Sequence, residues 1–217
     1  MKKINLITLS LISSLSMATM ATEMPVTAES SAPAATINAA LKATQANVVV
    51  TIPDSHLNLA LHGALSIPLS TPLTSDDLAT LVSFKVSEIG IKDLTGMEYC
   101  INLIDLRVVE NQDGVTEGLS NLKPISSLIK LETLYLYGND ISDISPLSGL
   151  VNIKDLNLNT NHITDISPLS NLKKMLSLNL NYNPLNNIDD LRELPQLTAL
   201  NIQEVNQNVP HIDFSPV

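Results

Sequence analysis

The chain has 217 residues, a formal net charge of −10 and a 44% share of hydrophobic residues. It contains one cysteine, which argues against a disulfide framework. The acidic balance and the lack of a basic stripe disfavour nucleic acid as a partner.

Residues 1–21 have the pattern of a secretory signal peptide. Lys2 and Lys3 form a basic start, residues 4–20 are apolar and rich in hydroxyl side chains, and cleavage is expected after Ala21. A retained membrane anchor is the alternative, but the run is short and interrupted. We therefore expect an exported protein that is secreted, periplasmic or at the cell surface, without a covalent anchor motif.

The next two segments predict a tether and a cap. Residues 22–47 are rich in Ala, Ser, Thr and Pro and lack apolar periodicity, which predicts a flexible segment. Residues 48–80 predict an N-terminal cap, because Leu57, Leu61 and Leu65 recur at helical spacing after Asp54, a suitable N-cap. Thr74–Asp77 fits the start of a second short helix.

Residues 81–205 contain repeats, which follow a strict 22-residue period between Leu131 and Leu197. Each pass has the spacing Leu-x-x-Leu-x-Leu-x-x-Asn, the leucine-rich repeat signature of a short strand, a turn and a compact return segment. One pass cannot bury its apolar side, so stacked passes should join their strands into a parallel sheet over one core. Three complete passes share this frame: Leu131, Leu134, Leu136, Asn139, Ile141, Ile144, Leu147 and Leu150; Ile153, Leu156, Leu158, Asn161, Ile163, Ile166, Leu169 and Leu172; Met175, Leu178, Leu180, Asn183, Leu185, Ile188, Leu191 and Leu194.

The frame extends in both directions. Upstream, a longer pass with the insertion Gln112–Glu117 rejoins the frame at Leu119, and a further pass precedes it. The outermost passes have Ile89 and Val205 where Asn is expected, as terminal repeats often do. Residues 206–217 form a tail that either covers the last strand or leaves its edge open, so we expect a monomer or a weak dimer through this C-terminal edge.

Several polar or reactive side chains are assigned to structure by this frame. The amides of Asn111, Asn139, Asn161 and Asn183 are expected to satisfy buried backbone groups in an internal ladder. Cys100 takes a position that leucine fills in later passes, which predicts a buried thiol.

Several motifs resemble the internalin-type class of bacterial leucine-rich repeats. They are the stretch 91–99 and the repeated Ile-x-Asp-Ile-Ser-Pro-Leu at 141–147 and 163–169. This resemblance covers about residues 49–205 and implies short 3₁₀ turns, whose start suits Ser-Pro. The expected fold is an α/β repeat solenoid: a curved stack with a parallel β-sheet on the concave face, 3₁₀ turns on the convex face and a small helical N-terminal cap.

No constellation for catalysis, metal binding or a cofactor is present in the sequence. We expect His56 and His62 on the surface of the cap helix and His162 on a turn, none with metal-ligand spacing. The Asp113-Gly114 pair resembles part of a calcium loop but puts Val109 where a carboxylate is required. The sequence therefore predicts a binding protein and no enzyme.

The outward strand positions predict a binding surface on the concave face. One column reads Lys85, Arg107, Tyr135, Asn157, Asn179, Asn201, and the next reads Ser87, Val109, Tyr137, Asn159, Asn181, Gln203. Exposed aromatics beside amides and an arginine are typical of interaction hot spots, although Tyr also favours strands for its own sake. The candidate partner-binding residues are Arg107, Tyr135, Tyr137, Asn157, Asn159, Asn179 and Asn181.

The favoured function is an exported bacterial protein that binds a protein ligand through the concave face, with adhesion or host-surface interaction as roles that the resemblance implies. A glycan ligand is an alternative, since Tyr and Asn also suit sugars. A cytosolic phosphatase regulatory subunit is a second alternative, because similar 22-residue repeats occur in that group.

Overall fold

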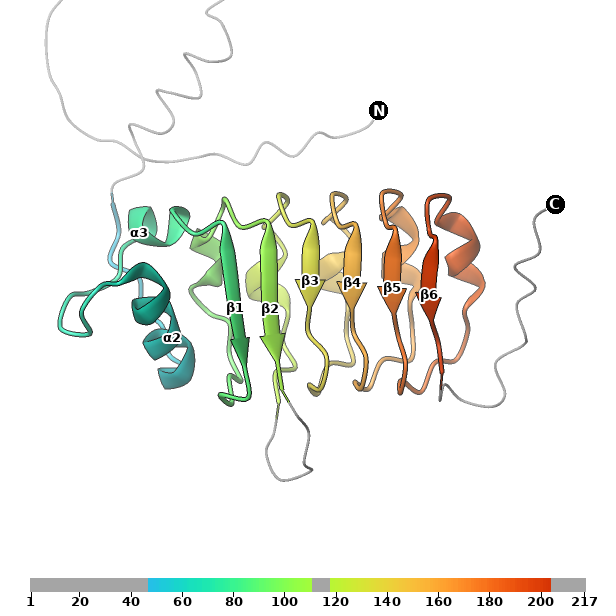
Figure 1. The fold of residues 1–217 in the computed structure, drawn as a ribbon, viewed down its shortest axis with the longest axis horizontal. Helices are drawn as coiled ribbons and strands as arrows, with labels where there is room; N and C mark the ends of the chain where they lie inside the picture. The colour runs from blue at the N-terminus through green and yellow to red at the C-terminus, as the bar shows by residue number, and fades with distance from the viewer. Residues whose placement is uncertain (1–46, 111–117, 204–217) are drawn as a thin grey trace, which may run out of the picture. The chain divides into compact units, whose positions relative to one another are not determined.

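The computed structural model describes residues 47–110 and 118–203 (Figure 1). The predicted signal peptide and nearly all of the predicted tether lie outside these ranges. So do Asn111, the insertion Gln112–Glu117, Val205 and the tail 206–217, and their predictions stay predictions.

Two short helices form where the sequence predicts the cap. Helix α2 spans Ser55–Leu65, and the Oδ1 atom of its N-cap Asp54 accepts hydrogen bonds from the backbone N–H groups of His56 and Leu57 at 2.9 Å. Helix α3 spans Ser75–Ala79 and begins with a capping box between Thr74 and Asp77. Leu57 and Leu61 are fully buried, which confirms the predicted apolar face of α2.

His62 corrects one prediction, because it is buried and does not lie on the surface of the cap helix. Its side chain is 5% exposed, and its Nδ1 atom lies 3.0 Å from the carbonyl oxygen of Ile67. Ser66 ends α2 in the left-handed conformation, with φ of 56°, and the chain then turns back toward the helix. This turn brings the Ile67 carbonyl to the ring. His56 and His162 are exposed, as predicted.

The repeats form one parallel sheet with the strand order β1-β2-β3-β4-β5-β6 (Figure 1). The register pairs each residue with the one in the same column of the neighbouring pass, for example Arg107 with Tyr135 and Tyr135 with Asn157. The predicted fold is thereby confirmed, and so is the predicted column of Lys85, Arg107, Tyr135, Asn157, Asn179 and Asn201. The strands are β1 Ser83–Ser87, β2 Asp105–Val109, β3 Thr133–Tyr135, β4 Asp155–Asn157, β5 Ser177–Asn179 and β6 Ala199–Asn201.

Short 3₁₀ turns return the chain on the other side of each pass, as the resemblance implies. Where Ser-Pro occurs it occupies the first two positions of the turn, because proline needs no N–H partner there. At the start of the turn that begins at Ser145, the Asp143 side chain accepts a hydrogen bond from the Ser145 backbone N–H at 2.9 Å. The turns are η1 Met97–Tyr99, η2 Lys123–Ile125, η3 Ser145–Leu147, η4 Ser167–Asn171 and η5 Asp189–Glu193.

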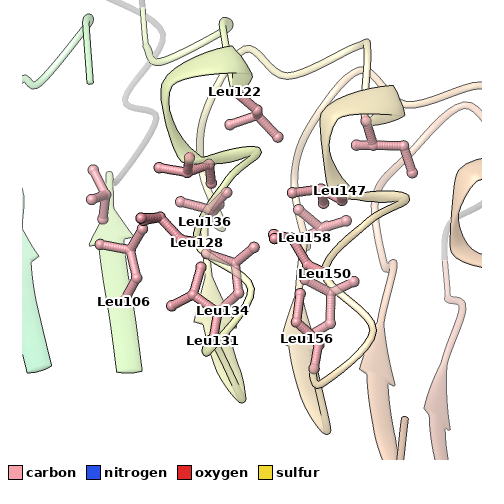
Figure 2. Packing of buried hydrophobic residues seen from close by; sticks show 14 of the residues in the cluster. Leu106, Leu122, Leu128, Leu131, Leu134, Leu136, Leu147, Leu150, Leu156 and Leu158 are labelled. Carbon is pink, nitrogen blue, oxygen red and sulfur yellow. The ribbon is translucent and has the colours of Figure 1, made fainter. Parts of the chain in front are cut away.

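The core lies between the strands and the 3₁₀ turns. Figure 2 shows leucines of neighbouring passes, such as Leu134 and Leu156, pointing into this layer. Cys100 is part of it and fully buried, and burial raises the pKa of its thiol to about 12, followed by a smaller effect of the Glu98 charge. Cys100 is therefore a packed, unreactive thiol, as its place in the frame predicts.

An asparagine ladder joins successive passes. The Oδ1 atom of Asn161 accepts from the Ile141 backbone N–H at 3.0 Å. Its Nδ2 group donates to the carbonyl oxygens of Leu136 and Leu158, both at 3.0 Å. Asn139 and Asn183 bond in the same way, so each amide satisfies groups of its own pass and of the preceding one.

The ladder also fixes where the longer pass re-enters the frame. The backbone N–H of Leu119 donates to Asn139 Oδ1 at 3.1 Å, in the role that Ile141 plays toward Asn161. The predicted return to the frame at Leu119 is thereby confirmed.

We predict that Asn161→Ala lowers the free energy of unfolding by roughly 3 kcal/mol or more, because three buried backbone groups lose their partner. Asn157→Ala is the matched control from the same pass. Among the described residues its Oδ1 atom accepts only from the half-buried Asn159 N–H, so the loss should stay below about 1 kcal/mol. Urea denaturation of the full chain measures both values, and equal losses would contradict the ladder's role.

Candidate functional site

The concave face consists of three columns of outward strand side chains. The second and third are those read from the sequence, and the register adds a first column on the same face. The first column contains Ser83, Asp105, Thr133, Asp155, Ser177 and Ala199.

Five side chains of the first two columns are linked across β1–β4, and we call them the charged cluster: Lys85, Asp105, Arg107, Tyr135 and Asp155. The Arg107 Nε and Nη2 atoms donate to the Asp105 carboxylate at 2.9 and 3.2 Å, and Lys85 Nζ lies 2.7 Å from Asp105 Oδ2. The Arg107 guanidinium stacks over the Tyr135 ring, 4.3 Å from its centroid. The Tyr135 hydroxyl donates to Asp155 Oδ2 at 2.5 Å.

These contacts shift the protonation equilibria of the cluster. Partial burial by itself would raise the pKa of Asp105, but the hydrogen bonds from Arg107 and Lys85 and their charges lower it overall. The hydrogen bond to Asp155, followed by partial burial, raises the pKa of the Tyr135 phenol. At neutral pH the Asp105 carboxyl is therefore ionised and the Tyr135 phenol is neutral.

Asp105 and Asp155 are not among the residues predicted from the sequence. Both lie two residues before a residue of the second column, on the same face of the same strands. Extending the column reading by one step would have found them. Without these two carboxylates, nothing in the column reading indicates that the Tyr135 side chain is held by its neighbours.

The two tyrosines differ from the expectation of fully exposed rings, because Tyr135 and Tyr137 are both half-buried. The Arg107 guanidinium covers the ring of Tyr135, and Asp155 binds its hydroxyl. Val109, expected to point outward in the third column, is only 8% exposed. The exposed area of the two tyrosine rings is therefore smaller than the sequence predicts, and the Tyr135 ring is held in place by Arg107 and Asp155.

Three of the four candidate asparagines of the second and third columns bond within their own pass, and Asn181 bonds to the next pass. The Oδ1 atoms of Asn157 and Asn179 each accept from the backbone N–H two residues later, at 3.1 Å. Asn181 Oδ1 accepts from the Gln203 N–H at 2.6 Å, and Asn159 Oδ1 accepts from the Thr160 hydroxyl at 3.0 Å. No described residue accepts a hydrogen bond from the Nδ2 groups of these four asparagines, which leaves those donors facing solvent.

Over residues 47–110 and 118–203, no group of three or more His, Cys, Asp or Glu side chains is placed to hold a metal ion. Among the same residues, no helix has the length and apolar character needed to cross a bilayer.

We predict that Asp155→Asn lowers the pKa of Tyr135 toward the ordinary value of about 10, because a charged acceptor is removed. Since the folded pKa is raised, the stabilisation is complete below the unfolded tyrosine pKa and is lost as the pH rises through the folded one. NMR titration of the Tyr135 ring, assigned with Tyr135→Phe, measures the shift. Asp190→Asn on η5 is the control, and an equal shift there would contradict the assignment.

The repeats match known families and structures. Residues 129–171 match a family model described as leucine rich repeats in two copies. A solved internalin of Listeria monocytogenes, internalin F, is 31% identical with a TM-score of 0.65, over 71% of this chain and 44% of that chain. No curated protein sequence matches the chain significantly.

Two further structures share the fold at lower identity. The functional domain of InlJ from Listeria monocytogenes is 24% identical with a TM-score of 0.66, over 75% of this chain and 34% of that one. A leucine-rich repeat protein of Leptospira interrogans is 21% identical with a TM-score of 0.53, over 63% and 35%. The chain spans less than half the length of each of these three structures. Its repeat period, 3₁₀ turns, asparagine ladder and likeness to internalin F together identify it as an internalin-type leucine-rich repeat protein.

Proposed function

We propose that the chain binds a protein ligand through the concave face, centred on Arg107, Tyr135 and Tyr137. The observation that carries this proposal is the Arg107–Tyr135 stack, which Asp105 and Asp155 fix on both sides. The leucine core does not need these side chains, because they lie on the opposite side of the sheet. An ordered cluster on a face that packing does not require is best explained by recognition.

The physical advantage of the cluster is preorganisation. Arg and Tyr are the residue types that dominate binding hot spots. Fixing a long side chain in one rotamer on binding costs about 0.5–1.5 kcal/mol. Here the Arg107–Asp105 ion pair and the Tyr135–Asp155 hydrogen bond already fix the rotamers in the free protein, so binding loses less side-chain entropy. Asn157, Asn159, Asn179 and Asn181 extend the surface with solvent-facing Nδ2 donors. These donors suit the carbonyl groups of a protein and also the hydroxyls of a glycan.

We predict that the double variant Tyr135→Ala, Tyr137→Ala weakens ligand binding by at least a hundredfold. The thermal midpoint should fall only modestly, because both rings are half-buried and outside the leucine core. A photoreactive amino acid at position 157 identifies the ligand by cross-linking, and the same group at the exposed Ser148 controls for non-specific capture. Calorimetry with the identified ligand then measures the affinity.

Tyr182→Asn is the matched aromatic control, since Tyr182 is exposed, lies outside the charged cluster and has a backbone φ of 56° that Asn tolerates. Unchanged affinity of the double variant would refute the concave-face site. Cross-linking to a glycan in place of a protein would favour the alternative ligand class.

We further propose that the chain is exported and acts outside the cytoplasm, in adhesion or interaction with another surface. The basic start at Lys2 and Lys3, the apolar run after it and the internalin-type repeats support this proposal. We predict that the secreted chain begins at Thr22, as N-terminal sequencing from a secreting bacterial host will show. Retention of Lys2 and Lys3 on a cytosolic product would refute export.

A further inference from the structure

The outer edge of β1 presents main-chain groups that no strand covers. In each parallel pair, alternate residues direct their N–H and C=O groups to alternate neighbours. The bonds from Asp105 N to Val82 O, at 3.3 Å, and from Glu88 N to Val109 O, at 2.8 Å, place the β2-facing groups on the even-numbered residues of β1. The groups of Ser83, Lys85 and Ser87 therefore point away from β2.

β1 is the first strand of the sheet, so within residues 47–110 and 118–203 these groups have no strand partner. The backbone groups of Ser83, Lys85 and Ser87 form no hydrogen bond with any residue of the described ranges beyond the β1–β2 ladder. In β2–β6 the corresponding groups bond to the preceding strand. The edge of β1 is thus an unfilled ladder position.

An apolar groove of about 430 Å³ runs along this edge, between β1 and α2. Figure 1 shows α2 lying beside β1 at the N-terminal end of the sheet. Leu59, Ala60, Gly63 and Ala64 line the helix side, and Phe84 and Val86 line the strand side. The three small residues keep the helix wall open, and a Cβ atom added at Gly63 meets nothing within 4 Å.

We propose that this groove binds an extended segment of a partner protein, which adds to the sheet as a strand beside β1. The row of alternating donors and acceptors on Ser83, Lys85 and Ser87 matches the main chain of an extended peptide. Apolar side chains at alternate peptide positions enter the groove between Leu59 and Val86. This site is separate from the concave-face site and does not depend on it.

Other occupants fit less well. A small apolar molecule would cover the edge and leave its polar groups unpaired. A second copy brings another formal charge of −10 to the contact. A partner segment with an acidic residue instead meets Lys85, whose side chain is 53% exposed, and the exposed His56 at the groove. Lys85 does not block the edge, since its side chain reaches over the sheet to Asp105 at 2.7 Å.

The first test measures amide hydrogen exchange of the full chain by NMR. In the free protein we expect the amides of Lys85 and Ser87 to exchange at least tenfold faster than that of Val86, which faces β2. Slow exchange of Lys85 and Ser87 in the free monomer would show that the chain's own residues fill the edge. Protection that grows with protein concentration would indicate a second copy. Either result overturns the proposal.

The probe is a phage-displayed library of random heptapeptides, selected on the full chain and counter-selected on Gly63→Phe, which fills the groove. We expect enriched peptides with apolar residues at alternate positions. The synthetic form of the strongest peptide should slow exchange of the Lys85 and Ser87 amides at least tenfold. N-methylation of its amides on the edge-facing side should weaken binding at least tenfold, whereas N-methylation of the alternate amides should not.

Gly149→Phe is the matched control, because a Cβ atom at Gly149 also meets nothing within 4 Å but the residue lies outside the groove. Ala64→Phe replaces Gly63→Phe if circular dichroism shows that the latter is misfolded. Failure to enrich any peptide that distinguishes the wild-type chain from the groove variant refutes the proposal. The double tyrosine variant should keep peptide binding, which separates this site from the concave-face site.

Discussion

One pass of this chain cannot bury its own apolar side, and every other feature follows from that constraint. Each strand and turn is completed by its neighbours, through the shared leucine layer and through asparagine amides that bond to the preceding pass. Asn161 shows how strict the requirement is, since its side chain serves three buried backbone groups. Because the inner side of the sheet is committed to packing, the outer side chains can vary without loss of the fold.

The sheet carries two surfaces of different kinds. The concave face presents side chains, and its charged cluster holds Arg107 and Tyr135 in one arrangement. The edge of β1 offers main-chain groups, because its neighbour on that side is the helix α2 rather than another strand. The cap therefore shields the end of the core without completing the ladder, and the two surfaces meet at Lys85.

The register was predictable because residues 22 apart occupy equivalent positions, so Tyr135 had to lie beside Asn157. The internal role of the ladder asparagines followed from the same frame. The Tyr135–Asp155 bond was not predictable from the columns read, since it runs diagonally between two columns of neighbouring strands. The burial of His62 was also not predicted from the sequence, because it depends on the turn that brings the Ile67 carbonyl back to the helix. Periodicity specifies backbone neighbours, whereas these contacts depend on side-chain rotamers and a local turn.

The bonds of the asparagine ladder join only adjacent passes, and this has a consequence for how the molecule changes over evolutionary time. A segment such as residues 154–175 begins and ends at equivalent points of the frame. Its duplication or removal would leave every amide with a preceding and a following pass, so no buried group would be orphaned. The span of the binding face is thus adjustable in discrete steps of one strand spacing, about 4.8 Å. Unequal recombination can therefore lengthen or shorten this face while the bonds of the asparagine ladder are kept.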